Sequence, residues 1–386
     1  MLKRICIVYV IILVFLMGFS SGAYAAVPAI EAEGAILMDA SSGKILYAKD
    51  ENKRWPPASI TKLMTMTLVF DALSSGKLHM EDKITASKYA CSMGGTQVWL
   101  EEGEQRSLKE MLTAIAVASA NDCSVAVAEH MAGSEEAFVE MMNAKAKELG
   151  MLNSHFSNSH GLPIENHYVS AKDMALLARY SLRYPEILSF TSIKQYTFRP
   201  EPKLLILYNT NKLLWWYPGS DGLKTGQTVE AKRNLVGTAK RDNLRLISVV
   251  LGVGKPKGHF SETIKLYNMG FSNYAFTKIY DLNQPICEME ISKGIKDKIT
   301  LVAARDVGAL HKKGQKIKPQ TTFNIKGKVA APIVKGQKLG EIIVAIDGKE
   351  AERVDLLASQ SLIKAGFWFN FNNILSQVFY LGIAAK

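Results

Sequence analysis

The chain has 386 residues, of which 48% are apolar and 22% charged, with 28 glycines and 12 prolines. This length favours two domains, and the composition excludes a disordered chain, a collagen-like chain and a multi-span membrane protein. Despite the formal net charge of +11, no interleaving of aromatic and basic residues points to a nucleic-acid partner.

Residues 1–25 have the pattern of a secretory signal. Lys3 and Arg4 precede a short apolar run, and a small-residue A-x-A exit ends at Ala25. We expect cleavage after Ala25 and export to the outer face of the cytoplasmic membrane. An uncleaved membrane anchor is the alternative, although the run is short for a span.

The sequence predicts neither a metal site nor a cofactor. Three cysteines remain after the signal, an odd number that cannot pair fully within one chain, and Cys123 is interpreted as a small core residue. Neither C-x-x-C nor H-E-x-x-H occurs. His155, His160 and His167 come nearest to a cluster, but the Ser, Asn and Gly residues around them indicate a loop.

Residues 26–279 predict a mixed α/β domain. Apolar residues recur at helical spacing near residues 108–116, 137–142 and 174–178. Two apolar runs, at residues 35–38 and 45–47, flank a Ser-Ser-Gly turn and predict a hairpin, and residues 244–253 predict a strand rich in Val, Ile and Leu.

Residues 280–362 predict a small all-β domain, because short β-branched runs alternate with turns that carry Lys and Gly. From residue 281 to the end, the sequence has 16 Lys and Arg residues but only 10 Asp and Glu residues. This excess suits an anionic surface such as a membrane or an acidic wall polymer, and a merely solvated Lys-rich face is an equally open interpretation.

Residues 363–386 predict an amphipathic helix. Trp368, Phe371 and Leu375 share one broad face with further apolar residues, and Asn and Gln lie opposite. We expect this helix to lie in the plane of a membrane surface. Packing on the β domain is the alternative.

One Ser-x-x-Lys tetrapeptide stands out among four, which begin at Ser41, Ser59, Ser74 and Ser361. Only Ser59 follows Pro-Pro-Ala and opens an apolar helical run. A helix there would place the Ser59 hydroxyl beside Lys62 at an N-terminal end, where backbone N–H groups favour negative charge. Acyl transfer by serine needs such a hydroxyl, a neighbouring base and an oxyanion hole.

Two further motifs occur once each. Ser119-Ala120-Asn121 is the only S-x-N and follows a predicted helix, and Lys224-Thr225-Gly226 is the only K-T-G and is expected to begin a strand. The order S-x-x-K, S-x-N, K-T-G is the arrangement of serine enzymes that recognise penicillin.

The motifs and the stretches around them, PASITKLMT, SANDCSVAVAEHMAG, DGLKTGQT and TAKRDNLRLISVVLG, resemble the low-molecular-mass penicillin-binding proteins that are D-alanyl-D-alanine carboxypeptidases. The resemblance implies a β-lactamase/transpeptidase-like catalytic domain, with a five-stranded antiparallel sheet flanked by helices, then a small β domain and an amphipathic anchor. It also implies removal of the terminal D-alanine from peptidoglycan pentapeptide stems, and acylation by β-lactams.

Carried over residue by residue, the resemblance makes Ser59 the nucleophile and Lys62 the general base. A free lysine has a pKa near 10.4, so Lys62 should be buried, with the Lys224 ammonium near it. Ser119 would relay a proton, and Asn121 would hold Lys62 or the substrate amide.

The resemblance also assigns substrate-binding roles to the K-T-G segment. Lys224 and Thr225 would bind the terminal carboxylate, and Gly226 would let the strand approach the peptide closely. The backbone N–H groups of Ser59 and Gln227 would form the oxyanion hole.

The sequence departs from the family pattern at three places that bear on carboxylate recognition and turnover. Gln227 stands where many relatives have His, Lys232 stands where many have Gly, and residues 209–214 lack an Arg found in some relatives. Three alternatives remain open: a β-lactamase, an endopeptidase that cuts cross-links, and a non-catalytic wall-binding protein.

Overall fold

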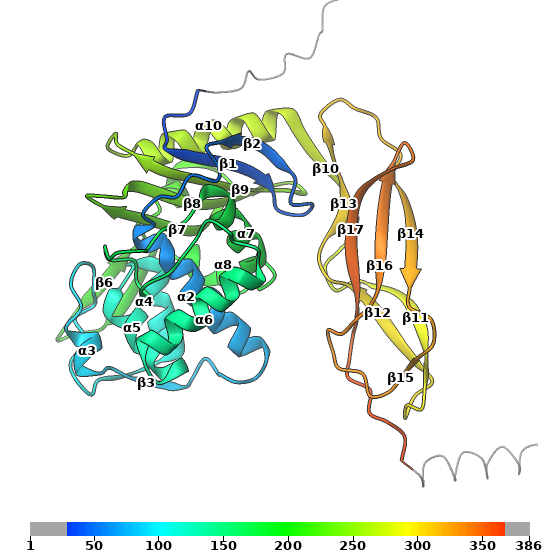
Figure 1. Cartoon of the computed structure of the whole chain (residues 1–386), viewed down its shortest axis with the longest axis horizontal. Helices are drawn as coiled ribbons and strands as arrows, with labels where there is room; N and C mark the ends of the chain where they lie inside the picture. The colour runs from blue at the N-terminus through cyan, green and yellow to red at the C-terminus, as the bar shows by residue number, and fades with distance from the viewer. Residues whose placement is uncertain (1–28, 367–386) are drawn as a thin grey trace, which may run out of the picture.

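The computed structural model describes residues 29–366, and within them a five-stranded antiparallel sheet carries the K-T-G motif (Figure 1). The strand order is β2-β1-β9-β8-β7. The strands are β1 (Gly34–Asp39), β2 (Ile45–Lys49), β7 (Ser220–Thr228), β8 (Lys232–Arg241) and β9 (Leu244–Val253). The expected hairpin of β1 with β2 is confirmed, and so is the expected strand at residues 244–253.

Strand β9 is buried along nearly its whole length because both faces of the sheet are covered. Helix α10 (Gly258–Asn273) packs on β8 and β9. Helix α7 (Ala171–Ser181) packs on β1 and β9 from the other side, where most of the other helices lie in Figure 1.

The helical region between β2 and β7 forms one continuous core with that face of the sheet. Helix α4 (Leu108–Val117) begins with a capping box of Ser107 and Glu110, which satisfies two N–H groups at the helix start. The other elements of the region are η1 (Ala58–Thr61), α2 (Lys62–Ser74), β3 (Lys83–Thr85), α3 (Lys88–Cys91), β4 (Gln105–Ser107), α5 (Asn121–Ala132), α6 (Glu135–Glu148), α8 (Ile187–Thr191), β5 (Gln195–Arg199), β6 (Leu205–Tyr208) and α9 (Leu213–Trp216). The helices expected near residues 108–116, 137–142 and 174–178 are confirmed as α4, α6 and α7.

From residue 274 to residue 366 the described chain is all β, as expected, with a separate core. A six-stranded sheet has the order β14-β16-β17-β12-β11-β15, and β10 pairs with β13. The strands are β10 (Tyr274–Tyr280), β11 (Pro285–Ser292), β12 (Lys298–Ala303), β13 (Val307–Lys312), β14 (Gln320–Ile325), β15 (Val329–Ala330), β16 (Lys338–Ile346) and β17 (Lys349–Ala358). The domain boundary that we propose, between residues 279 and 280, falls within β10, one residue before the strand ends.

Polar contacts join the turn between β1 and β2 to the β domain. The Ser41 hydroxyl donates to Glu352 Oε1 over 3.0 Å, and Arg305 donates to the same carboxylate. Glu352 is 5% exposed, and its Oε2 accepts the Gly308 N–H over 3.1 Å. The buried Glu352 carboxylate therefore accepts hydrogen bonds from residues of both domains.

Two expectations concern segments outside the described residues. The signal at residues 1–25 lies outside them entirely, and the amphipathic helix at residues 363–386 lies outside them beyond residue 366. Between residues 29 and 366, no helix combines the length and the apolar character that a membrane crossing needs.

We predict that Glu352→Ala lowers the free energy of unfolding by about 1–3 kcal/mol, because it leaves a buried N–H and a guanidinium without their acceptor. Calorimetry measures the loss. The control is Glu350→Ala on the same strand, whose exposed ion pair with Arg353 contributes little. Equal effects of the two substitutions would show that Glu352 does not join the domains.

Candidate active site

Ser59 and Lys62 lie at a 3-10 turn that leads into an α-helix. Ser59 belongs to η1, and Lys62 is the first residue of α2, so the expectation that Ser59 itself opens an α-helix is wrong in detail. In a 3-10 turn the side chains at i and i+3 eclipse, and Lys62 Nζ lies 3.3 Å from Ser59 Oγ. The tighter turn thus brings the two groups together more directly than an α-helical turn.

The buried amine of Lys62 has two short contacts to acceptors. Lys62 is 0% exposed, and its Nζ lies 2.6 Å from Asn121 Oδ1 and 2.6 Å from the His160 carbonyl oxygen. The Asn121 amide nitrogen donates to the Gly94 carbonyl over 2.7 Å, which directs its oxygen toward Lys62. A neutral amine has two N–H donors and one lone pair. With both N–H groups given to these oxygens, a neutral Lys62 has only its lone pair left for the third contact of Nζ, which is with Ser59 Oγ.

Burial lowers the pKa of Lys62 well below its ordinary value, and the charge of Lys224 lowers it further. The negative charges of Asp122 and Glu135 act in the opposite direction and are outweighed. The expected burial of Lys62 near Lys224 is therefore confirmed. The neutral, proton-accepting form of Lys62 is favoured by the fold.

Ser119 lies in the connection between α4 and α5, and Asn121 begins α5. Ser119 is 5% exposed, and its hydroxyl has no hydrogen-bond partner among the described residues. Its φ of 69° and the φ of 50° at Ala58 are in the left-handed region, where a non-glycine residue costs about 1–3 kcal/mol. Backbone strain therefore occurs at the second motif serine and beside Ser59.

Lys224, Thr225, Gly226 and Gln227 follow one another on β7, the edge strand that contacts η1. The expectation that Lys224 begins the strand is wrong, because β7 begins at Ser220. Lys224 is 1% exposed, and burial lowers its pKa to about 7. The Gln227 side chain is exposed.

Gly226 is needed for contact between β7 and the Ser59 turn. A Cβ at this position would lie 2.8 Å from the Pro57 carbonyl oxygen and 3.0 Å from the Ser59 nitrogen. Real Cβ atoms essentially never show the first distance, and the second is tighter than nine in ten of their contacts. The glycine therefore lets the strand approach the turn that carries Ser59, a role in addition to the expected approach to a peptide.

Several residues at the site were not anticipated from the sequence. The His160 carbonyl contacts Lys62, and the Thr210 hydroxyl lies 2.6 Å from the Thr225 hydroxyl. The backbone of Gly161, at φ 94°, passes so close that a Cβ would lie 2.0 Å from the Ala58 carbonyl oxygen. The sequence carried a signal only for His160 and Gly161, because the Asn-Ser-His-Gly pattern at residues 158–161 indicates a loop. It could not show that the His160 carbonyl contacts Lys62, since every residue has a backbone carbonyl.

Comparison with known proteins gives consistent similarities over both domains. Residues 22–255 match the D-alanyl-D-alanine carboxypeptidase family of peptidases, and residues 274–364 match the C-terminal domain of penicillin-binding protein 5. D-alanyl-D-alanine carboxypeptidase DacF of Bacillus subtilis is 43% identical, over 87% of each chain. DacA of Haemophilus influenzae is 35% identical, over 88% of each chain.

Solved structures agree with these sequence similarities. Penicillin-binding protein 5 of Haemophilus influenzae superposes with a TM-score of 0.68 at 34% identity, over 88% of this chain and all of that chain. Penicillin-binding protein 6B of Escherichia coli gives 0.67 at 30% identity, over 87% and 98%. Penicillin-binding protein D2 of Listeria monocytogenes, solved in an ampicillin-bound form, gives 0.57 at 31% identity, over 63% and 100%.

We predict that Gly226→Ala slows acylation by penicillin about 100-fold, because the added methyl pushes β7 away from the Ser59 turn and misplaces the reacting groups. Acylation rates with a fluorescent penicillin measure this. Gly254→Ala is the control, since a Cβ there would meet no atom within 4 Å. An unaltered rate in G226A would contradict the close approach.

Two buried imidazoles make stability depend on pH. Burial lowers the pKa of His160 and of His167 to about 3, whereas an unfolded histidine titrates near 6.5. Between these values the unfolded chain binds protons that the folded chain does not bind. The free energy of unfolding should therefore fall as the pH decreases below about 6.5, by up to about 1.4 kcal/mol per pH unit for each ring.

Denaturant titrations at pH 7.5 and pH 5.5 measure this dependence. The variant His167→Gln should lose less stability between the two pH values than the unmodified protein. The same loss in both proteins would mean that His167 is protonated in the folded state.

Proposed function

The chain belongs to the D-alanyl-D-alanine carboxypeptidase family, and from that premise we propose that Ser59 is the residue on which its acyl-enzyme forms. The family and the penicillin-binding fold make the protein a serine-type D-Ala-D-Ala carboxypeptidase that β-lactams acylate. The proposal assigns the chemical steps to residues of this chain.

In the first step Lys62 takes the proton of the Ser59 hydroxyl, and Ser59 Oγ attacks the carbonyl carbon of the penultimate D-alanine. The C–N bond to the terminal D-alanine then breaks, and Ser119 relays a proton from Lys62 to the leaving amine. Water hydrolyses the ester by the reverse proton path. The observation that carries the proposal is the buried Lys62 amine, which donates to two acceptors and lies 3.3 Å from Ser59 Oγ.

Asn121 holds Lys62 in this orientation. Its amide contacts Lys62 on one side and the Gly94 carbonyl on the other. Because the side chain is 3% exposed and has both contacts, it has little freedom to turn toward another partner.

Lys224 and Thr225 bind the terminal carboxylate of the substrate. Lowering the pKa of Lys224 to about 7 means that burial disfavours its ammonium form by roughly 5 kcal/mol relative to water. A carboxylate beside it would restore the charged form, and that gain favours an anionic chain end. Thr210, which belongs to the segment that lacks the Arg of some relatives, contacts the Thr225 hydroxyl and fixes its position.

The backbone N–H groups of Ser59 and Gln227 form the oxyanion hole. Gly226 supports this proposal because the Cβ position of Gly226 is only 3.0 Å from the Ser59 nitrogen. Two N–H donors aimed at the developing oxyanion would contribute several kcal/mol to the rate.

We further propose that the protein is exported and attached to the outer face of the cytoplasmic membrane. The signal pattern at residues 1–25 and the amphipathic pattern at residues 363–386 support this. The excess of basic residues after residue 281 would favour an anionic membrane. The domains would then be residues 26–279 for catalysis and residues 280–362 for the β domain.

Mass spectrometry of the intact protein after penicillin treatment tests the nucleophile. We expect one penicilloyl adduct on the peptide that contains Ser59, and release of D-alanine from a pentapeptide ending in D-Ala-D-Ala. Ser59→Ala should abolish both, while Ser41→Ala, the matched substitution in another Ser-x-x-Lys tetrapeptide, should retain both. An adduct on any other residue would contradict the assignment.

A further inference from the structure

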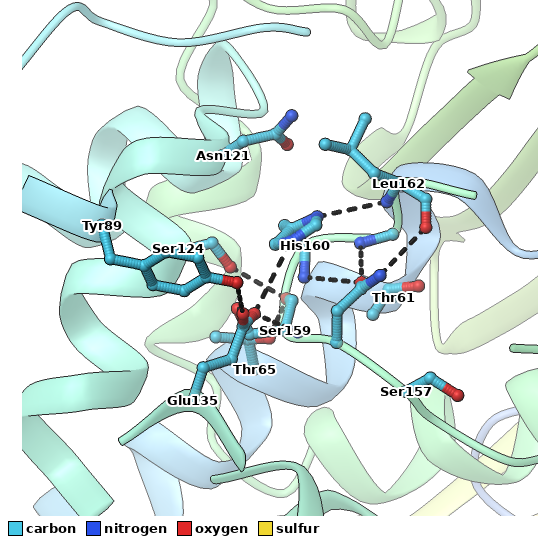
Figure 2. A network of polar contacts seen from close by, with 12 residues as sticks. Thr61, Thr65, Tyr89, Asn121, Ser124, Glu135, Ser157, Ser159, His160 and Leu162 are labelled. Atoms are coloured by element: carbon cyan, nitrogen blue, oxygen red, sulfur yellow. Dashed lines mark hydrogen bonds and ion pairs between the residues drawn. The ribbon is translucent and has the colours of Figure 1, made fainter. Parts of the chain in front are cut away.

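A polar network lies beside the catalytic motifs and centres on the carboxylate of Glu135 (Figure 2). Glu135 is the first residue of α6, where the helix dipole favours a negative charge, and it is 6% exposed. Its Oε1 accepts the Ser159 N–H over 2.8 Å and the Ser159 hydroxyl over 2.6 Å. Its Oε2 accepts the Tyr89 hydroxyl over 2.9 Å. Three donors therefore fix this carboxylate against the loop.

The Ser159 peptide, which Glu135 holds, is next to the His160 carbonyl that contacts the proposed base, Lys62. The Ser159 carbonyl accepts hydroxyl groups from Thr65, over 2.6 Å, and from Ser124, over 2.9 Å. The next carbonyl, that of His160, accepts an N–H of Lys62 over 2.6 Å. Since Thr65 is one turn after Lys62 on α2, the loop is joined to the helix of the base at two successive carbonyls.

The His160 ring also belongs to the network. Its Nδ1 accepts the Leu162 N–H over 3.1 Å, so the proton of the neutral ring is on Nε2. Nε2 lies 3.6 Å from Glu135 Oε1. The ring edge therefore faces the carboxylate, and Figure 2 shows the ring between the Glu135 side and the Leu162 side of the loop.

We propose that Glu135 is a positioning residue for the base: by holding the Ser159 peptide it fixes the His160 carbonyl, and that carbonyl directs the Lys62 lone pair toward Ser59. The inference rests on the proposed function, since it requires Lys62 to be the base. Without Glu135 the buried Ser159 N–H loses its acceptor, and the contacts of Thr65 and Ser124 with the Ser159 carbonyl remain. The His160 carbonyl is then held less firmly toward Lys62. Lys62 could then donate to Ser59 instead of accepting its proton.

Glu135 also acts on Lys62 through its charge. The charged and titratable groups that face Lys62 are Lys224 from β7, Asp122 and Cys123 from α5, Glu135 from α6, and His160 and His167 from the segment before α7. Tyr89 from α3 faces Glu135, and Glu129 and Glu136 add negative charge near Tyr89. The charge of Glu135 raises the pKa of Lys62 against the effect of burial. Position and charge can therefore be separated by substitution.

Two substitutions make that separation. Glu135→Gln keeps an oxygen for the Ser159 donors and removes the charge, so acylation at high pH should stay within about threefold of the original. The acid limb of its pH profile should move to lower pH by about half a unit, since Lys62 loses its proton more readily. Glu135→Ala removes the acceptor as well, and we expect acylation per active site to fall about 10- to 100-fold at every pH.

The measurement is the rate constant for acylation by a fluorescent penicillin between pH 5 and pH 10, using the exported chain with its β domain. Rates are expressed per site titrated by the penicillin, which excludes unfolded protein from the comparison. Glu136→Gln removes a charge from the neighbouring residue, whose carboxylate is hydrogen-bonded to Ser134 at the helix start. This control should leave both the rate and the profile unchanged.

The outcomes separate this inference from the proposed function. If the unmodified protein acquires no adduct on Ser59, the proposed function is wrong. If it is acylated there and E135A reacts within twofold of it, Glu135 does not position the base. The inference is also overturned if E135Q loses as much rate as E135A at high pH, or if its acid limb does not move. Slow E135A, fast E135Q and a shifted acid limb together support it.

Discussion

The amine of Lys62, the base that we propose, has to lose its proton inside the protein, and the arrangement of the site depends on how that amine is buried. A lysine side chain in water keeps its charge at neutral pH. Here the side chain is wholly enclosed at the start of α2, with Lys224 close enough to disfavour a second positive charge. Two oxygen acceptors, from Asn121 and His160, occupy both N–H groups. A neutral amine then has only its lone pair left for the third contact of Nζ, which is with Ser59 Oγ.

The fold supplies these groups from segments that are far apart in the chain. The turn of Ser59 and Lys62, the start of α5, the loop before α7 and the strand β7 meet at one edge of the sheet. Glycines at positions 161 and 226 permit the contacts, because a side chain at either position would collide with the backbone around Ser59. The strained backbone at Ala58 and Ser119 has to be compensated by the surrounding core, which is continuous through the helical region and the sheet.

Much of this arrangement could be predicted from the sequence because it follows from local patterns. The hairpin of β1 with β2 follows from a turn of small residues, the strand at residues 244–253 from its apolar run, and the burial of Lys62 from the chemistry of a lysine base. The start of β7 at Ser220 was not predicted. The K-T-G motif was expected to begin the strand, but it lies in the middle of β7. The Glu135 network was also missed. It joins residues more than twenty positions apart through backbone groups, and a carbonyl or an N–H has no signature in the sequence.

The titration of Lys62 itself tests the account most directly. Lysine labelled with nitrogen-15 at Nζ, with Lys62→Met to assign the signal, reports the protonation of this one amine by NMR as the pH is raised. The account predicts a midpoint well below the ordinary lysine value, so that the amine is neutral at a pH at which an exposed lysine is still charged. An ammonium that persists until about pH 10.4, as in an exposed lysine, would contradict it.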